Sequence, residues 1–401
     1  MKKQLLIVMM VMAAATVSAQ GVSQYDLNQA IGWASVDELT TGSNDENPVV
    51  VTTTNELTNA LKGNDKKTIY IKGELTFTGR KDVTCQNKTI YGLPGSALVN
   101  ATHSTSKSES GILRFSNCKN IILRNVTFKS AGAYDMDGYD NLTLDNSSMH
   151  IWIDHCDFQD GVDGNLDCNN GSDYLSITWC RFRYLIAPWS GGSGGSNDHR
   201  YSNLWGGGDT NAKDKDHLRT TFANCWWDEG CVERMPRVRY GQVHILNCLY
   251  SSTTVGNYCI GAGYRANLYV EECAFTSNAA IKKYWKNYAT KSGYTDYNIT
   301  VTNCLNVANV QKRSGSIDYF IPSNVYSYTP YSKEEVQLEV STYAGATLAI
   351  AENEPYTTGI PQLMDNRRPA VDAPRYNLAG QRVDDSYKGI VIQGGRKFLV
   401  K

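Results

Sequence analysis

The densest group of side chains that could do chemistry lies in residues 233–241, which read ERMPRVRYG. Arg234, Arg237 and Arg239 fall within six residues and are separated by Pro236. A guanidinium group is planar, always charged and shaped to bind carboxylate or phosphate. Proline interrupts regular strand pairing and makes a rigid corner. We therefore interpret this stretch as an anion-binding site; the alternative is a solvated charged edge.

Acidic residues without matching bases gather upstream of the arginines. They form two groups: Asp135, Asp137 and Asp140, and then Asp160, Asp163 and Asp167. If adjacent repeats bring these groups side by side, the carboxylates raise one another's pKa unless a cation lies between them. Oxygen ligands on loops suit calcium. The spacing is not that of an EF-hand, and surface acids without an ion remain the alternative.

A repeat runs through most of the chain and sets the spacing of these groups. The pattern apolar-x-apolar-x-x-Cys ends at Cys156, Cys180, Cys225, Cys248, Cys273 and Cys304, with Val126 in the same position of an earlier copy. Copies recur about every 24 residues with insertions, as in repeat proteins. Within each copy the apolar residues alternate with period two, as in strands. The sequence therefore predicts an all-β fold, a right-handed parallel β-helix (a solenoid) with long loops on the binding face.

The same repeat predicts how the cysteines pack. Equivalent positions of successive coils lie above one another, so the six cysteines should form one internal column of small apolar side chains. The alternative, a metal cluster or reactive thiols, lacks any C-x-x-C pair. Asparagines just before this position are expected to stack or bond at a turn: Asn117, Asn125, Asn224, Asn247 and Asn303.

Composition divides the chain into four segments. Residues 1–19 have a positively charged start, an apolar run too short to span a membrane and a small-residue cleavage site, the pattern of a signal peptide. The β-helix domain is expected over residues 20–350. Residues 351–373 are polar and proline-rich, as in a linker. Residues 374–401 are expected to form two short strands about a turn.

The charge balance argues against two classes of partner. The chain has 39 Lys and Arg against 40 Asp and Glu, a net charge of -1. Neither a nucleic acid nor an anionic membrane is attracted by such a chain as a whole. No later stretch is long and apolar enough for membrane insertion. We expect an exported, water-soluble monomer.

Several segments of the chain form a recognisable set: IWIDHCDFQD, DGNLD, SDYLSITWCRF and ERMPRVRYGQVHILN, with VVVTTTNELTNAL and KTIYGLPGS nearer the start. Together they resemble the pectate lyases of polysaccharide lyase family 1, over about residues 32 to 350. The resemblance implies a parallel β-helix that binds Ca²⁺ and cleaves polygalacturonate, the backbone of pectin. The implied reaction is a calcium-dependent β-elimination that gives 4,5-unsaturated oligogalacturonides.

The resemblance also implies roles for individual residues. Arg234, the first arginine of R-x-P-x-x-R, corresponds to the base that removes the C5 proton of galacturonate. Arg239, the last arginine, corresponds to a substrate-binding group, and Arg237 is expected to bind substrate beside it. The W-I-D-H signature around Asp154 is expected to be structural. The implied calcium ligands are Asp140, Asp163 and Asp167, with Asp137 as a fourth.

The chain departs from the family pattern at one point. The family has a substrate-binding lysine shortly after the strand SITWCRF, and no lysine occurs there in this chain. The candidates to replace it are Arg183, at the end of that strand, and Lys213 and Lys215 in the long polar loop that follows.

Two other functional classes stay open, and the export route is partly indicated. A glycoside hydrolase on the same solenoid would use two carboxylates about 5 to 9.5 Å apart, which the arginine cluster argues against. A non-catalytic glycan-binding β-helix is the third class. Residues 374–401 resemble the C-terminal tails of secreted enzymes of some Gram-negative bacteria, so we expect an extracellular, periplasmic or outer-surface location in such a bacterium.

Overall fold

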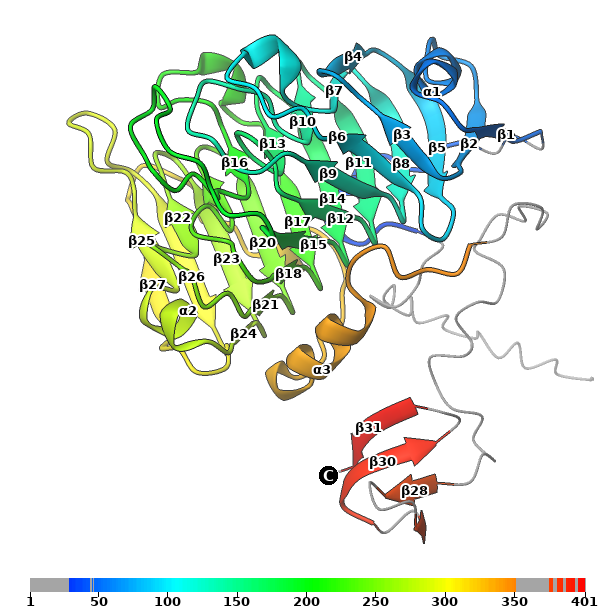
Figure 1. Ribbon diagram of the computed structural model, residues 1–401. Coiled ribbons are helices and arrows are strands. Elements are labelled where there is room, and N and C mark those ends of the chain that lie inside the picture. Colours follow the sequence, from blue (N-terminus) through cyan, green and yellow to red (C-terminus); the bar gives the residue numbers. More distant parts are fainter. Residues whose placement is uncertain are drawn as a thin grey trace, which may run out of the picture.

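The computed structural model describes residues 29–43, 45, 47–350, 375–377, 381–384, 387–393 and 396–400. The predicted signal peptide and linker lie outside these residues. The part between β1 and β27 winds through three parallel sheets that run side by side along one axis (Figure 1). This confirms the predicted all-β parallel β-helix.

Each turn of the helix contributes one strand to each sheet. Sheet I comprises β1 (Val49–Val51), β2 (Lys67–Ile71), β5 (Gln86–Gly92), β8 (Lys119–Arg124), β11 (Met149–Asp154), β14 (Asp173–Thr178), β17 (Thr220–Ala223), β20 (Gln242–Leu246), β23 (Asn267–Glu271), β26 (Asn298–Thr302) and β27 (Val310–Lys312). Sheet II comprises β4 (Lys81–Val83), β7 (Leu113–Ser116), β10 (Leu142–Asp145), β13 (Leu166–Cys168), β16 (Leu204–Trp205), β19 (Arg237–Val238), β22 (Ile260–Ala262) and β25 (Trp285–Asn287). Sheet III comprises β3 (Glu74–Thr76), β6 (Ala97–Asn100), β9 (Thr127–Ser130), β12 (Asp157–Gln159), β15 (Arg181–Arg183), β18 (Trp226–Trp227), β21 (Leu249–Tyr250) and β24 (Ala274–Phe275). Only the last pair of sheet I, β26 with β27, is antiparallel in these three sheets.

Short helices lie at the ends and in the loops. They are η1 (Gly32–Ser35), α1 (Thr54–Ala60), η2 (Lys107–Glu109), η3 (Ala212–Asp214), α2 (Asn278–Lys282), η4 (Pro322–Asn324) and α3 (Lys333–Tyr343). The helix α1 covers the apolar interior of the first coil, and its Leu57 joins the solenoid core. In α3, Val336 and Val340 pack on Trp179 and Leu249 outside sheets I and III.

The C-terminal segment holds more strands than predicted. Its described residues form β28 (Arg375–Asn377), β29 (Arg382–Val383), β30 (Gly389–Gln393) and β31 (Arg396–Val400), an antiparallel sheet in the order β29-β28-β30-β31. Each of the two predicted strand segments therefore makes a hairpin, because each has turn residues in its middle.

The six cysteines of the repeat form the predicted column. The register of sheet I pairs Asp154 with Thr178, Thr178 with Ala223 and so on, which places the cysteines two residues further on at one level in each coil. The Cys225 N–H donates to Cys248 Sγ at 3.4 Å, and the Cys248 N–H donates to Cys273 Sγ at 3.3 Å. All eleven cysteines are buried and free.

The asparagines before the column occupy a left-handed turn. Asn125, Asn224, Asn247 and Asn303 have φ between 48° and 61°, a region that asparagine tolerates better than most residues. Asn247 donates its side-chain N–H to the carbonyls of Glu272 and Tyr331, at 3.0 and 2.8 Å. Asn117 has the same conformation, with φ 55°, but at the turn between β7 and β8, where it precedes Cys118, whose Sγ lies 3.6 Å from that of Cys85. It therefore does not belong to the column of Cys156.

The W-I-D-H signature has the predicted structural role. Asp154 is buried between Arg124, at 2.9 Å from its Nε, and His155, at 2.7 Å from its Nδ1. The Trp152 indole N–H donates to Thr178 Oγ1 at 2.8 Å. Burial would raise the pKa of Asp154, but the charges of His155 and Arg124 outweigh it and lower that pKa to about 2.

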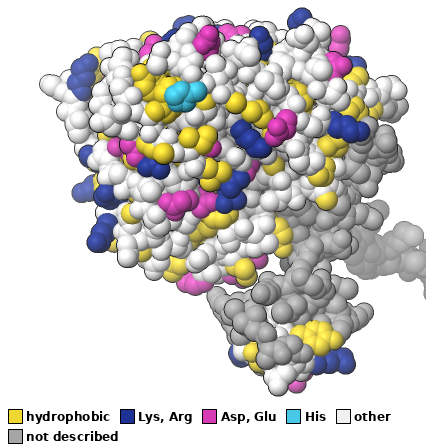
Figure 2. Space-filling view, viewed as in Figure 1, with side chains coloured by type: hydrophobic (Ala, Val, Ile, Leu, Met, Phe, Trp, Pro, Cys, Tyr) yellow, Lys and Arg dark blue, Asp and Glu magenta, His cyan; other side chains and the backbone are white. Residues whose placement is uncertain are grey.

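Charged side chains of both signs are interspersed over the face drawn in Figure 2, in keeping with the net charge of -1. Among the residues that the structure describes, no helix is both long and apolar enough to cross a membrane.

The buried Asp154 group predicts a specific loss of stability in acid. A carboxyl group whose folded-state pKa is lowered stabilises the fold above its unfolded pKa of about 3.9, and this contribution disappears as the pH falls through about 2. We expect Asp154→Asn to lower the free energy of unfolding at pH 7 by roughly 3 kcal/mol and by much less at pH 2. Denaturant unfolding followed by tryptophan fluorescence at both pH values measures this, and equal losses at both would contradict it.

Candidate active site

The loops that enter the strands of sheet II bring the candidate residues into neighbouring coils. Asp140 lies two residues before β10, and Arg234 lies three residues before β19. Backbone hydrogen bonds connect the loops in series: Asn141 N–H to Gly164 O at 3.1 Å, Asn165 N–H to Ser202 O at 2.9 Å and Asn203 N–H to Arg234 O at 2.7 Å. Asp140 and Arg234 are therefore three strand spacings apart, each about 4.8 Å.

A ladder of buried asparagines holds these loops from the inside. Asn141, Asn165 and Asn203 are fully buried. Asn141 Nδ2 donates to Asn165 Oδ1 at 3.0 Å, and Asn203 Nδ2 donates to the carbonyl of Leu166 at 3.0 Å. Trp227 Nε1 closes the ladder by donating to Asn203 Oδ1 at 2.7 Å. Asn165 takes part through its Oδ1 alone, which also accepts the N–H of Gly161 at 3.1 Å, whereas its Nδ2 is buried without a partner. These bonds fix the position of the backbone on either side of the asparagines.

Asp140 and Asp167 face a common space beside Gly164. A Cβ on Gly164 would lie 2.8 Å from Asp140 Oδ1 and 3.0 Å from Asp167 Oδ1, so only glycine leaves this space open. Burial, and then the charge of Asp163, raises the pKa of Asp140 to about 7, although Thr143 donates a hydrogen bond to it. Burial and the charge of Asp140 also raise the pKa of Asp167. The two carboxylates are thus destabilised in their charged forms unless a cation joins them.

Asp163 is near this pair but is held from another side. Its Oδ1 lies 3.1 Å from Nε2 of His199, and His199 Nδ1 lies 2.8 Å from Oδ1 of Asp135. In the part of the chain that the structure describes, no three His, Cys, Asp or Glu side chains converge as a complete metal site. The hard oxygens of Asp140 and Asp167 and the notch at Gly164 nevertheless fit a calcium ion that takes its other oxygens from water or a ligand.

Two aspartates of the acidic groups have other surroundings. The side chain of Asp137 is 94% exposed and pairs with Lys107 Nζ at 2.8 Å, so the structure does not bring it to the other predicted ligands. Its neighbour Asp135 is the buried one. Asp160 accepts the backbone N–H groups of Leu185 and Ile186, at 2.6 and 2.8 Å, and anchors the start of the long loop.

Arg234 reaches the acidic residues from the opposite direction. Its φ is 58°, and its guanidinium carbon lies 4.6 Å from the centre of the Tyr201 ring. Burial lowers the pKa of Arg234, but the charges of Asp167, Tyr258 and Asp163 outweigh this, and the net shift is upward. The acidic residues thus hold the guanidinium in its charged form.

The other two arginines of the cluster differ in their partners. Arg237 stands on β19 with its guanidinium 4.1 Å from the ring of Tyr288. Burial and the charge of Arg239 lower the pKa of Arg237. Arg239 is paired with Asp209 at 2.8 Å and donates to the carbonyl of Gly206 at 2.9 Å.

Arg234 and Arg237 differ from Arg239 in having no carboxylate partner among the described residues. Within the described residues, neither lies within 4 Å of a carboxylate oxygen, and the Nε of each is buried without a hydrogen-bond partner. A charged group removed from water without a partner is costly. The two unpaired guanidinium groups are consistent with the anion-binding site predicted from the sequence.

The three candidates for the missing lysine do not join this group. Arg183 is on β15 in sheet III and pairs with Asp157, with Nη2 2.6 Å from Oδ2. Lys213 and Lys215 are exposed at η3, where the carbonyl of Lys213 packs on Gly171 in the turn after β13. The residues of the site lie in the loops before the strands of sheet II or, like Asp167 and Arg237, on those strands, whereas this turn follows them.

His199 and Tyr201 were not among the residues predicted from the sequence. Both lie in the loop between β15 and β16, which has no repeat pattern. Their ring centres are 4.1 Å apart. They stand in the sequence HRY at the end of the insertion, just before β16 resumes the solenoid, and no repeat or motif marks them there.

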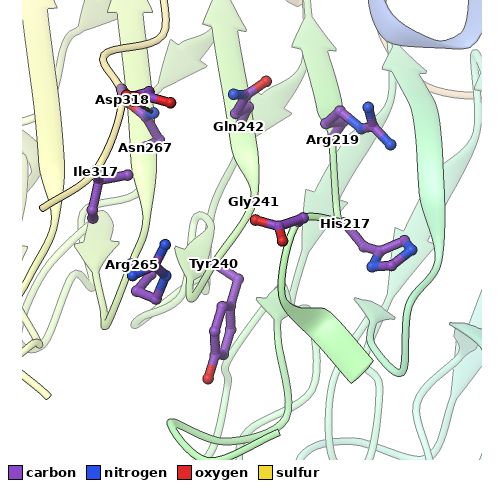
Figure 3. A pocket seen from close by; sticks show the side chains of 10 residues that line it. His217, Arg219, Tyr240, Gly241, Gln242, Arg265, Asn267, Ile317 and Asp318 are labelled. Atoms are coloured by element: carbon purple, nitrogen blue, oxygen red, sulfur yellow. Dashed lines mark hydrogen bonds between the residues drawn. The ribbon is translucent and has the colours of Figure 1, made fainter. Parts of the chain in front are cut away.

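A separate hollow of about 240 Å³ lies where the chain passes from sheet II to sheet I (Figure 3). Its lining includes His217, Arg219, Tyr240 and Arg265 and none of the predicted site residues. Arg219 is already committed to Asp173, with its Nε 3.0 Å from both carboxylate oxygens. This hollow is distinct from the candidate active site.

Comparisons with known proteins point to one group. A family model described as pectate lyase matches residues 5–348. The pectate trisaccharide-lyase of Thermotoga maritima is 28% identical over 261 residues, which is 61% of this chain and 63% of the relative. The chain therefore spans somewhat less than two thirds of that relative's length.

Solved structures show the shared fold. A Bacillus subtilis pectate lyase variant is 21% identical with a TM-score of 0.63, over 83% of this chain and 99% of that one. A pectate lyase from a Bacillus species, solved in complex with trigalacturonate, is 19% identical with a TM-score of 0.58, over 78% of this chain and 98% of that one.

The repulsion between the buried carboxylates can be measured without any substrate. Because the folded-state pKa of Asp140 is raised to about 7, its ionised form destabilises the fold above that pH and not below about pH 4. We expect Asp140→Asn, in chelator, to raise the free energy of unfolding at pH 8 by on the order of 1 kcal/mol or more. Thermal melting at pH 5 and pH 8 tests this, and a variant no more stable than wild type at pH 8 would contradict it.

Proposed function

Because the chain belongs to the pectate lyase family, we propose that it is a secreted polysaccharide lyase that cleaves polygalacturonate by calcium-dependent β-elimination. One observation carries the proposal most strongly. Arg234 and Arg237 are guanidinium groups without a carboxylate partner among the described residues, and Arg234 is close enough to Asp167 and Asp163 for their charges to raise its pKa. The ligand that fits such a site carries negative charge and also tolerates neighbouring carboxylates.

Polygalacturonate has this property when a divalent cation accompanies it. Each sugar carries one carboxylate, which can pair with a guanidinium or share a cation with a protein carboxylate. The pectate lyase solved in complex with trigalacturonate is a relative that binds such an oligosaccharide. We infer that Arg237 binds a carboxylate of the substrate chain, with Tyr288 keeping the guanidinium in place.

Asp140 and Asp167 are the residues that would hold calcium, in the notch that Gly164 leaves open. Asp163 would be the third carboxylate, one residue before that glycine. The ion, when bound, neutralises the protein and substrate carboxylates and so stabilises the charge that develops at C5. Asp137 is no longer included, because it faces solvent beside Lys107.

Arg234 is the proposed base. Its upward pKa shift arises from the charges of the acidic residues, whereas burial lowers its pKa. Once those charges are neutralised, burial dominates and a neutral guanidine becomes accessible at alkaline pH. Arg234 then takes the C5 proton, the electrons of the C5–H bond form the C4=C5 bond, and the C4–O bond breaks. The leaving oxygen takes up a proton from water.

Export is part of the proposal. The predicted signal peptide at residues 1–19 would direct the chain out of the cytoplasm. A polymeric substrate is found outside that compartment. The location, extracellular, periplasmic or on the outer surface of a Gram-negative bacterium, stays a prediction from the signal peptide and the C-terminal tail.

The assay that separates the functional classes is incubation with polygalacturonate. We expect ultraviolet absorbance from the unsaturated product, its abolition by chelator and its return with added calcium. New reducing ends without absorbance would indicate a hydrolase, and binding without cleavage would indicate a glycan-binding protein. Full activity in chelator would contradict the calcium assignment.

The role of Arg234 is tested by a substitution that keeps the charge. Arg234→Lys removes the planar fork and moves the nitrogen, so we expect kcat to fall by about 10² to 10⁴ or more while the circular dichroism spectrum is unchanged. Arg183→Lys is the matched control, because Arg183 is paired with Asp157 in another sheet, and it should keep near wild-type kcat. A fully active Arg234→Lys enzyme would move the role to another residue.

A further inference from the structure

His199 joins two acidic residues from different coils. Its ring lies between Asp135 and Asp163, with Nδ1 2.8 Å from the first carboxylate and Nε2 3.1 Å from the second. The side chain is only 7% exposed. Asp135 follows β9, Asp163 precedes β13, and His199 comes from the long loop between β15 and β16. One imidazole therefore links three segments that are distant in sequence.

The loop that carries His199 is itself fastened to Asp135. Ser196 N–H donates to Asp135 Oδ2 at 2.5 Å, and Gly194 N–H donates to the Asp135 carbonyl at 2.9 Å. A Cβ on Gly194 would lie 2.1 Å from Asp135 Oδ1, so this approach requires glycine. Further back, Trp189 donates its indole N–H to the carbonyl of Gly132 at 3.0 Å. The imidazole is thus presented from a fixed backbone.

The same short segment reaches the arginine side of the site. The ring of His199 is 4.1 Å from that of Tyr201, and the Tyr201 ring is 4.6 Å from the Arg234 guanidinium carbon. Residues 199–201 therefore contact both the acidic residues and the proposed base. The two halves of the site are kept in register by this segment as well as by the backbone ladder.

We infer that His199 is a positioning residue of the active site, which fixes the Asp163 carboxylate for cation binding. The inference rests on the proposed function. Nε2 is hydrogen-bonded to Asp163, and Nδ1 is buried 2.8 Å from Asp135 without hydrogen-bond geometry, so neither nitrogen is open to the substrate. Its Nε2 takes one oxygen of Asp163 and leaves the other for a ligand. Fixing a carboxylate before the ion arrives removes an entropic cost from binding, as outer partners of metal ligands do elsewhere.

Two substitutions separate the two contacts of the ring. In His199→Gln the amide nitrogen can take the place of Nε2 and keep the bond to Asp163. In His199→Asn the amide nitrogen can take the place of Nδ1 and keep only the contact with Asp135. His199→Ala removes both. His217→Ala is the matched control, since that histidine lines the separate hollow (Figure 3) and contacts the carbonyl of Lys215 at 2.8 Å.

The measurement is calorimetric titration of each full-length variant with calcium chloride alone, followed by assay of lyase activity against calcium concentration. We expect the calcium Kd of His199→Ala and His199→Asn to rise by about 10-fold to 100-fold. His199→Gln should stay close to wild type, as should His217→Ala. The calcium needed for half-maximal activity should rise by the same factor, with kcat at saturating calcium changed much less. A purely structural role would lower kcat and melting temperature together instead.

Three results would overturn the inference. If His199→Ala folds as wild type by circular dichroism and binds calcium equally or more tightly, His199 does not position Asp163. If Gln and Asn behave alike, the contact between Nε2 and Asp163 is not the one that matters. If the wild-type chain binds no calcium, the inference and the calcium part of the proposed function fall together, whereas the first two results leave that function standing.

Discussion

Parallel backbone pairing between successive coils is the constraint on which the rest of this structure depends. It sets residues of equivalent register about one strand spacing apart, whatever their charge. In the loops that enter sheet II this rule places Gly164 one coil beyond Asp140 and Arg234 three coils beyond it, and the buried asparagines help to keep the loops at these levels. The charges of the site are therefore brought together by the solenoid and not by their own attraction. That arrangement permits electrostatic frustration that a free loop would relax.

The frustration has two parts of opposite sign. Burial raises the pKa of both Asp140 and Asp167, and the charge of Asp163 adds to the shift of Asp140 as that of Asp140 adds to the shift of Asp167. Among the described residues no carboxylate oxygen lies within 4 Å of the Arg237 guanidinium, and burial lowers its pKa. Arg234 lies between the two regions, and the charges of Asp167 and Asp163 raise its pKa. A cation would neutralise the carboxylates of Asp140 and Asp167, and an anionic sugar would neutralise the guanidinium of Arg237. A substrate carboxylate that binds together with the ion would therefore balance both charges.

The sequence predicted what repeats and missed what does not. The cysteine column follows from a local pattern recurring in each coil, so one correct register places all six residues. Asp140, Asp163 and Asp167 came from resemblance, and spacing alone left an ionless surface cluster open. Asp137 and Asp135 are two residues apart, and only the fold of their loop decides which is exposed. His199 sits in an insertion without periodicity, and its partners precede it by 36 and 64 residues, so nothing local could identify it.

The insertion thus does more than lengthen a loop on one face. A solenoid offers flat, evenly spaced positions, which suit a regular polymer but do not enclose a reacting atom. The loop between β15 and β16 folds back on Asp135 and so encloses the site on one side. It places His199 against the acidic residues and Tyr201 against Arg234. Glycine at 194 is needed because the backbone must approach a carboxylate closely. The regular coils set the distances between charges, and the irregular loop sets the orientation of the groups that carry them.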